Sequence, residues 1–240
     1  METVVETVIE SVHRDLVSRG AVALRPDEVS ACAGIAPGEW TRFAGHWEDL
    51  AVDPYAAEHG TRRLRRYGAF LLTAGGRLTP RPYEAFVQPD ASNPMYVDVD
   101  RHFEPLTASF AADPVLAALA GLLVRAAGCL EERDEWLFKV HPFRVTAHAG
   151  QDGRPTPEGR HRDGVTLVSS LLIGRENATG GQSSVYGADG ERVLRTTLAE
   201  PGSLLLGDDR RTLHEVTPVR PVDEARPARR DVLVMTLLSP

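Results

Sequence analysis

The residues whose types and spacing can do chemistry gather in the C-terminal half of the chain. His161 and Asp163 stand two positions apart in the stretch HRDGVTLVSSLLIG, and His214 follows 53 positions after His161. Two histidines and one carboxylate on one face of a metal ion bind iron(II) and leave the opposite face open for small molecules. Residues two apart in an extended chain point the same way, so His161 and Asp163 can converge on one ion.

The same residues also have a plainer interpretation. Asp163-Gly164 can be a polar turn in front of an ordinary strand, and His214 can be a hydrogen-bonded core histidine. Of the other histidines, His141 and His148 lie on the preceding strand pattern and are expected to line a cavity. The remaining ones precede the β-rich region and fit a metal centre less well: His13, His46, His59 and His102.

A diacid co-substrate would add a second requirement. A molecule such as 2-oxoglutarate chelates iron through its 2-oxo acid end, and its other carboxylate needs a buried cation, ideally an arginine. The last strand pattern, ARPARRDVLVMTLL, offers Arg229 and Arg230. Arg230 is preferred because it alternates with Val232 and Val234, and Arg229 is the alternate. In a chain so rich in arginine, each can otherwise be a solvated surface charge.

The elements that must position these residues are β-strands from Trp136 onward. Segments rich in strand-formers follow one another without a helix long enough for a parallel crossover. This order favours an antiparallel sandwich or jelly roll. The predicted strands are WLFKVHPFRVTAHA, GVTLVSSLLIG, the hairpin SSVYGADGERVLRTTL, GSLLLGD and RDVLVMTLL.

We expect one domain over residues 1–240, with a helical buttress and substrate-loop region at 1–135 and a jelly-roll core at 136–240. Asp113-Pro114 supplies a cap and a first-turn proline for a long helix. In the first part, hydrophobic periodicity predicts a helix with Val5, Val8, Ile9, Val12 and Leu16 on one face. Short helices or turns are expected over 37–47 and 53–59, and the stretch 63–72 is expected to begin a strand. The long helix is expected over about 105–132.

Composition excludes several classes of function. The net charge is −7, so charge gives no help to nucleic-acid binding. No span is long and apolar enough for a membrane helix. Cys32 and Cys129 are far apart and form no spaced motif, so they are expected to be reduced thiols. The segment METVVETVIESVHRDL has acidic residues where a signal peptide needs basic ones. Both features are typical of a cytoplasmic protein. The expected partner is a small molecule, and the sequence does not decide whether the protein forms a homodimer.

Longer stretches around the candidate residues resemble a known family. TPEGRHRDGVTLV, GREN, GGQSSVYG, DDRRTLHEVTPV and RRDVLVMTL are together similar to the bacterial 2OG-Fe dioxygenase family that includes L-isoleucine 4-hydroxylase and related free amino-acid hydroxylases. The resemblance implies a mainly β fold with N-terminal and flanking helices, a double-stranded β-helix (jelly roll, cupin-like). It also implies Fe(II), 2-oxoglutarate and O2. Carried over by position, His161, Asp163 and His214 are the catalytic iron ligands, and Arg230 anchors 2-oxoglutarate.

The resemblance extends to residues that could contact the substrate. Gln88 and Asn93 stand in FVQPDASNP, and Arg144 in HPFRV could hold a substrate carboxylate beside His141. Their plainer roles are hydrogen bonds that brace a loop and, for Arg144, a salt bridge. Asp163 occupies a position that is a small residue in related halogenating enzymes, which favours hydroxylation.

These observations predict hydroxylation of an unactivated C–H bond of a free L-amino acid or a small amino-acid-like molecule, with succinate and CO2 as co-products. The alternatives are desaturation, a substrate held on a carrier protein, or a metal-binding barrel without catalysis. A zinc hydrolase is a weaker alternative, because the same ligands can bind zinc. The sequence does not predict which amino acid, or which of its carbons, is oxidised.

Overall fold

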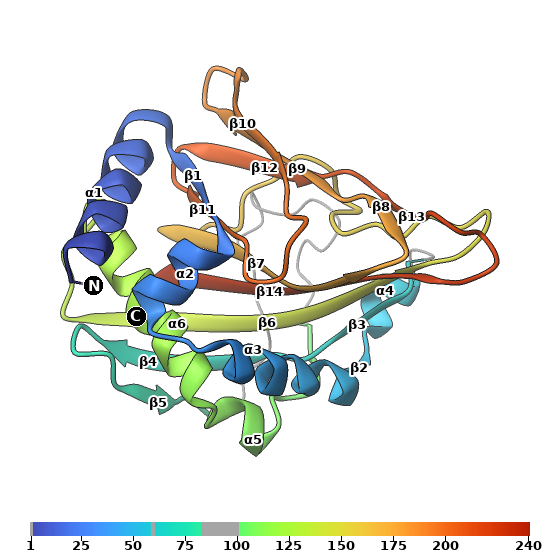
Figure 1. Cartoon of the computed structure of the whole chain (residues 1–240), viewed down its shortest axis with the longest axis horizontal. Coiled ribbons are helices and arrows are strands. Elements are labelled where there is room, and N and C mark those ends of the chain that lie inside the picture. The colour runs from blue at the N-terminus through green and yellow to red at the C-terminus, as the bar shows by residue number, and fades with distance from the viewer. Residues whose placement is uncertain (1, 59–60, 83–100) are drawn as a thin grey trace.

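Two antiparallel β-sheets pack face to face and form the centre of the molecule (Figure 1). The structure is a computed structural model, and it describes residues 2–58, 61–82 and 101–240. The larger sheet has, in spatial order, strands β1 (Ala21–Leu24), β11 (Leu204–Asp208), β7 (Leu167–Glu176), β14 (Ala228–Leu238), β6 (Glu135–Ala147), β3 (Arg63–Arg65) and β2 (Ala51–Val52).

Shorter strands complete the two sheets. Strand β4 (Gly68–Thr73) also pairs with β6, and β5 (Leu78–Pro80) pairs with β4. The smaller sheet has the order β10 (Arg192–Thr197), β9 (Gln182–Gly187) and β12 (Thr212–Val216). A separate ribbon joins β13 (Val219–Pro221) to β8 (Ala178–Gly180). The strand pairings of the described residues are antiparallel, as the absence of crossover helices predicts.

Side-chain alternation along β6 and β14 separates two environments. Successive residues of a strand point to opposite faces of the sheet. One face of these two strands lines a cavity between the sheets, through Lys139, His141, Phe143, Val145, Arg230, Val232, Val234 and Thr236. The other face enters the hydrophobic core, through Trp136, Phe138, Val140, Leu233, Met235 and Leu237.

Helices cover the core side of the larger sheet. The long helix α6 (Pro114–Ala127) packs on β14, and α1 (Glu2–Arg19), α2 (Pro26–Ala33) and α3 (Pro37–Ala44) pack on α6. Their buried faces share one hydrophobic cluster with the strands, from Val12 and Leu16 to Leu237. The remaining helices are the 3-10 helix η1 (Gly45–Asp49), α4 (Pro54–Glu58) and α5 (Ala108–Ala111). No helix of the described residues is long and apolar enough to cross a membrane.

The start of α6 is fixed as its sequence predicts. Asp113 accepts a hydrogen bond from the backbone N–H of Val115 at 2.9 Å, and Pro114 occupies the first turn. The Asp113 carboxylate also binds Arg42 and His46, so the cap ties the α3–η1 segment to α6. This cluster holds the helical layer in place behind the sheet that carries the cavity.

The predicted mainly β fold with N-terminal and flanking helices is confirmed. The strands expected from Trp136 onward are present, and so is the hairpin around Asp189-Gly190. The sequence did not predict α2, the edge strand β1 or the β8–β13 ribbon. The first 135 residues also supply both edges of the larger sheet, through β1 and through β2, β3 and β4, in addition to the expected helices.

Candidate metal centre

A pair of backbone hydrogen bonds brings the two candidate histidine ligands together. The N–H of His161 donates to the carbonyl of His214 at 3.0 Å, and the N–H of His214 donates to the carbonyl of His161 at 2.8 Å. This isolated antiparallel bridge joins β12 to the loop that precedes β7, and it places the two ring centroids 4.4 Å apart. The bridge therefore brings two imidazole rings from distant parts of the sequence next to each other.

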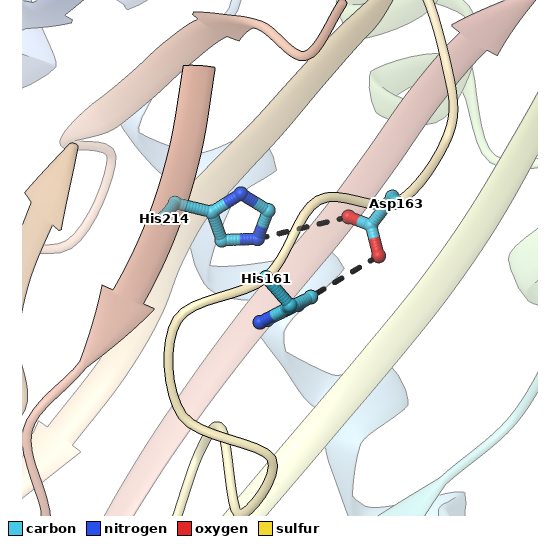
Figure 2. Close-up of side chains that lie close together, drawn as sticks. All are labelled: His161, Asp163 and His214. Carbon is cyan, nitrogen blue, oxygen red and sulfur yellow. Dashed lines mark ion pairs between the residues drawn. The ribbon is translucent and has the colours of Figure 1, made fainter. Parts of the chain in front are cut away.

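The side chains of His161, Asp163 and His214 converge as Figure 2 shows. The Nε2 atom of His161 lies 3.9 Å from Oδ1 of Asp163, and Nε2 of His214 lies 3.8 Å from Oδ2 of the same carboxylate. One ligand atom from each residue lies within 4.8 Å of the others. The Nδ1 atom of His161 is 3.0 Å from the carbonyl of Gly159. A hydrogen bond from Nδ1–H to that carbonyl leaves the Nε2 lone pair free for a metal.

Asp163 lies on a loop in front of β7, as the predicted strand beginning at Gly164 implies, although β7 itself starts three residues later. Strand β7 begins at Leu167, and Gly164 has a φ of 75°, in the left-handed region that favours glycine. The carboxylate of Asp209 holds this loop by accepting hydrogen bonds from the N–H groups of Asp163, Gly164 and Val165 at 2.7–3.1 Å. Asp209 and the turn at Gly164 therefore hold the loop on which Asp163 faces the histidines.

Asp209 is the residue of this site that sequence reasoning missed. It is fully buried, and its Oδ1 lies 3.8 Å from Nδ1 of His214. Burial raises its pKa, and the nearby Asp163 carboxylate raises it further. A carboxylate behind a metal-binding histidine orients the ring and increases its basicity. The signal that could have found it is the acidic pair Asp208-Asp209, which ends a buried strand five residues before His214.

The donor set fits ferrous iron. Burial, together with the neighbouring His161, lowers the pKa of His214 to about 3, so this imidazole is neutral and can donate its lone pair. The ligand atoms of the three residues lie within 4.8 Å of one another, close enough to share one ion. Burial raises the pKa of Asp163, and a bound cation favours its ionised form. Two imidazoles and one carboxylate with an open side are the facial arrangement of non-haem iron.

The three residues line a cavity of about 430 Å³ between the two sheets. This volume is at the lower end of the range for small-molecule sites. The candidate ligands lie on one wall, and the alternating residues of β6 and β14 form the opposite wall. The cavity therefore has room beside the metal centre for small molecules.

Arg230 lies at one end of the cavity wall. It is 4% exposed, its Nε has no hydrogen-bond partner, and no carboxylate of the described residues forms an ion pair with it. Burial, with a contribution from the nearby Arg175, lowers its pKa to about 10, so it remains a cation at neutral pH. A buried cation without a counterion is a site for an anionic ligand.

Arg229 has the opposite environment. Its side chain is 41% exposed and forms an ion pair with Glu176 at 2.8 Å. The geometry therefore favours Arg230 over Arg229 as a carboxylate ligand. Gly181 helps to shape this end of the cavity, because a Cβ atom there would lie 3.2 Å from Nε of Arg230 and 3.1 Å from Nη1 of Arg175.

A cluster of arginines forms another part of the wall. Arg63, Arg65 and Arg101 line the cavity and are buried, and the carboxylate of Asp53 accepts a hydrogen bond from Arg63 at 2.8 Å. His141 also lines the cavity, as expected, and its Nδ1 lies 2.7 Å from Nη2 of Arg65. Burial and these cations lower the pKa of His141 well below its ordinary value, so its ring is neutral.

The structure does not bring every expected substrate residue to the cavity. Arg144 is absent from the described cavity wall and forms ion pairs with Asp231 at 2.8 Å and Glu48 at 2.9 Å. The salt-bridge interpretation of this residue is the one that its contacts support. Gln88 and Asn93 lie outside the described residues.

Similarity to known proteins extends over most of the chain. A family model described as 2OG-Fe dioxygenase matches residues 44–236. The chain is 27% identical, over 196 residues, to a protein of Pantoea ananatis (strain AJ13355) named 3(1)-hydroxy-L-isoleucine 4-dioxygenase. This match covers 79% of the chain and 77% of the relative.

Solved structures show the same arrangement of strands and helices. A bsmA homolog from Methylobium petroleophilum PM1 is 35% identical with a TM-score of 0.88, over 96% of this chain and 93% of that one. IDO from Bacillus thuringiensis is 18% identical with a TM-score of 0.80, over 97% and 99% of the two chains, and shows a shared fold. The family model matches residues 44–236, which is most of this chain, so the chain belongs to the 2OG-Fe dioxygenase family. Enzymes of this family use Fe(II), 2-oxoglutarate and O2.

Proposed function

We propose that the protein is an Fe(II)- and 2-oxoglutarate-dependent hydroxylase of a free L-amino acid or a small amino-acid-like molecule. One observation carries the proposal. A cavity of about 430 Å³ has the three candidate iron ligands on one wall, a buried arginine without a carboxylate partner among the described residues at one end, and further arginines around it. This is the arrangement that an iron-bound diacid and a second small molecule with a carboxylate require.

The proposed roles follow from charge and position. His161, Asp163 and His214 hold Fe(II), and Arg230 holds the far carboxylate of 2-oxoglutarate through paired N–H groups. When bound, iron with 2-oxoglutarate and O2 supplies the oxidising chemistry that converts C–H to C–OH, as 2-oxoglutarate becomes succinate and CO2. Asp209 holds the Asp163 loop through hydrogen bonds, and its carboxylate lies 3.8 Å from Nδ1 of His214, close enough to attract that ring nitrogen. The protein itself needs no general base for this reaction.

The apolar part of the wall positions the target carbon. Val232 and Val234 on β14 and Val168 on β7 line the cavity beside the metal ligands. Such side chains exclude water from the reacting centre and hold an aliphatic group without competing for the metal. The arginine cluster offers a cationic surface for a carboxylate, which every free amino acid carries. The name of the Pantoea relative, whose substrate is an amino acid, supports this substrate class.

We also propose that residues 1–240 act as one domain. The helices of the first part and the strands of the second share the large hydrophobic cluster that runs from Val12 to Leu237, which supports one domain.

An amino-acid panel tests the proposed function. The purified protein is incubated with each common L-amino acid, and with hydroxylated and other side-chain-modified amino acids, in the presence of Fe(II), 2-oxoglutarate, ascorbate and air. The products are analysed by mass spectrometry. We expect one amino acid, or a few related ones, to gain one oxygen atom with one succinate formed per product. His161→Ala, checked for folding by circular dichroism, should form neither product. A product that has lost two hydrogens would indicate desaturation, and no amino-acid product from a folded, iron-loaded protein would refute the proposal.

A further inference from the structure

Glu158 is an acidic residue of the cavity wall that is not one of the three candidate metal ligands. It belongs to the segment TPEG that precedes His161, and it lines the cavity with its side chain 11% exposed. Its Oε1 lies 3.3 Å from Nε2 of His161, which is its only ion-pair partner among the described residues. The nitrogen that it contacts is therefore the one that faces the metal position.

The contact between Glu158 and His161 is incompatible with a bound metal. A metal bound at Nε2 uses the lone pair of that nitrogen, which then has no N–H group to donate to Glu158. The Nδ1–H group is already directed to the Gly159 carbonyl and cannot replace it. In the metal-loaded protein, the largely buried Glu158 carboxylate therefore has no donor among the described residues, which is unfavourable until a new partner arrives.

The charges that surround Glu158 restrict what this partner can be. Besides Asp163, which serves the metal, Glu158 is the only acidic residue of the described cavity wall, and the wall also carries Arg63, Lys139 and Arg230. The co-substrate is a dianion and cannot neutralise a carboxylate. A cationic group of the second small molecule can, and in a free amino acid that group is the α-ammonium.

We propose that Glu158 binds the α-ammonium group of the substrate and selects free amino acids over analogues in which that group is acylated or missing. The inference rests on the proposed function and makes its substrate class specific. The α-carboxylate then lies toward the arginine cluster, and the ammonium lies beside the metal centre, so that the two charges orient the side chain within the cavity.

Binding measurements on Glu158→Gln test the inference. The matched control is Glu191→Gln, the same chemical change on an exposed turn outside the cavity wall. Each protein is loaded with Fe(II) and 2-oxoglutarate without O2 and titrated by calorimetry with the common L-amino acids and their N-acetyl derivatives. We expect the wild type and Glu191→Gln to bind an amino acid well and its N-acetyl derivative poorly. In Glu158→Gln, amino-acid affinity should fall about 10- to 100-fold, because a hydrogen bond to a charged group is lost.

Further readouts separate this role from a structural one. Fe(II) affinity, measured by competition with a chelator, should change by no more than about twofold in Glu158→Gln. The KM for the amino acid should rise far more than kcat falls, and the preference over the N-acetyl derivative should shrink. A loss of iron affinity of about tenfold or more would instead make Glu158 a metal ligand and overturn the inference.

The possible failures are distinguishable. If the wild type binds an amino acid and Glu158→Gln binds it equally well, the inference is wrong while the proposed function stands. If the folded, loaded wild type binds and oxidises no member of the panel, the proposed function fails and the inference fails with it.

Discussion

Replacing Arg230 by glutamine should selectively destroy the affinity for 2-oxoglutarate. Arg230 is 4% exposed and lines the cavity without a carboxylate partner among the described residues. We propose that it forms paired hydrogen bonds with the far carboxylate of the co-substrate. Glutamine keeps much of the length of the side chain but removes the positive charge and one arm of the donor pair.

The expected magnitude follows from this burial. Removing one partner of a desolvated, hydrogen-bonded charge pair costs about 2–5 kcal/mol, which corresponds to a rise in Kd of about 30-fold to several thousand-fold. Without co-substrate the effect on stability should have the opposite sign or be absent. Burial lowers the pKa of Arg230 to about 10, which means that the fold disfavours its charged form. The unliganded variant should therefore unfold at the same temperature as the wild type or higher.

The assay is 2-oxoglutarate binding without O2, followed by KM for 2-oxoglutarate measured through succinate formation. Arg229→Gln is the control, because Arg229 is 41% exposed and its ion pair with Glu176 is a surface contact. The control should change both values by less than about twofold. Equal 2-oxoglutarate affinity in Arg230→Gln and the wild type, or an equal loss in the two variants, would refute the assignment.

Other substitutions have separate expected results. Asp209→Asn should reduce Fe(II) affinity about 10- to 100-fold, measured by chelator competition, and unchanged affinity would show that this carboxylate does not support the ligands. Gly181→Ala should raise KM for 2-oxoglutarate about tenfold, because the new methyl group crowds Arg175 and Arg230 and the φ of 64° is strained for alanine. An unchanged KM would contradict this. Gly121→Ala, in α6 with no atom within 4 Å of the new Cβ, should raise the free energy of unfolding in urea by about 0.5–1 kcal/mol, and destabilisation would refute the helix argument.

The candidate metal centre could be proposed from residue types because few side chains bind iron. His161, Asp163 and His214 were expected together, and the structure brings their side chains within reach of one ion. How they meet was not predictable. The bridge between His161 and His214 joins segments 53 residues apart, and no local pattern specifies such a pairing. The hydrogen bonds from the loop around Gly164 to Asp209 were not predictable either, because they join residues about 45 positions apart.

Alternation along strands decided which arginines face the cavity. Arg230 shares a face with Val232 and Val234, as the period of two predicts, and Arg229 points to the other side. The same rule places Arg144 opposite to His141 and Phe143, so the expectation that Arg144 contacts substrate conflicted with the strand pattern itself. Its ion pairs with Asp231 and Glu48 are the structural result.

Residues after the end of a strand were the hardest to predict. Asp209 follows β11 in a turn, where no periodicity tells an inward side chain from a solvated one. Glu158 also lies outside the helices and strands, so no periodicity predicts the direction of its side chain. The roles of both carboxylates depend on how deeply they are buried, and this is known only from the folded structure. Asp209 is fully buried, and the side chain of Glu158 is 11% exposed.

The most direct test of the proposed reaction is to follow both atoms of labelled O2 during turnover of the amino acid that the panel identifies. The reaction proposed for this cavity predicts one labelled oxygen in succinate and one labelled oxygen in the hydroxylated amino acid, in equal amounts. Both labels should be absent in His161→Ala. Labelled succinate with an amino-acid product that has lost two hydrogens, or with no oxidised amino acid at all, would contradict the proposal that this protein is an amino-acid hydroxylase.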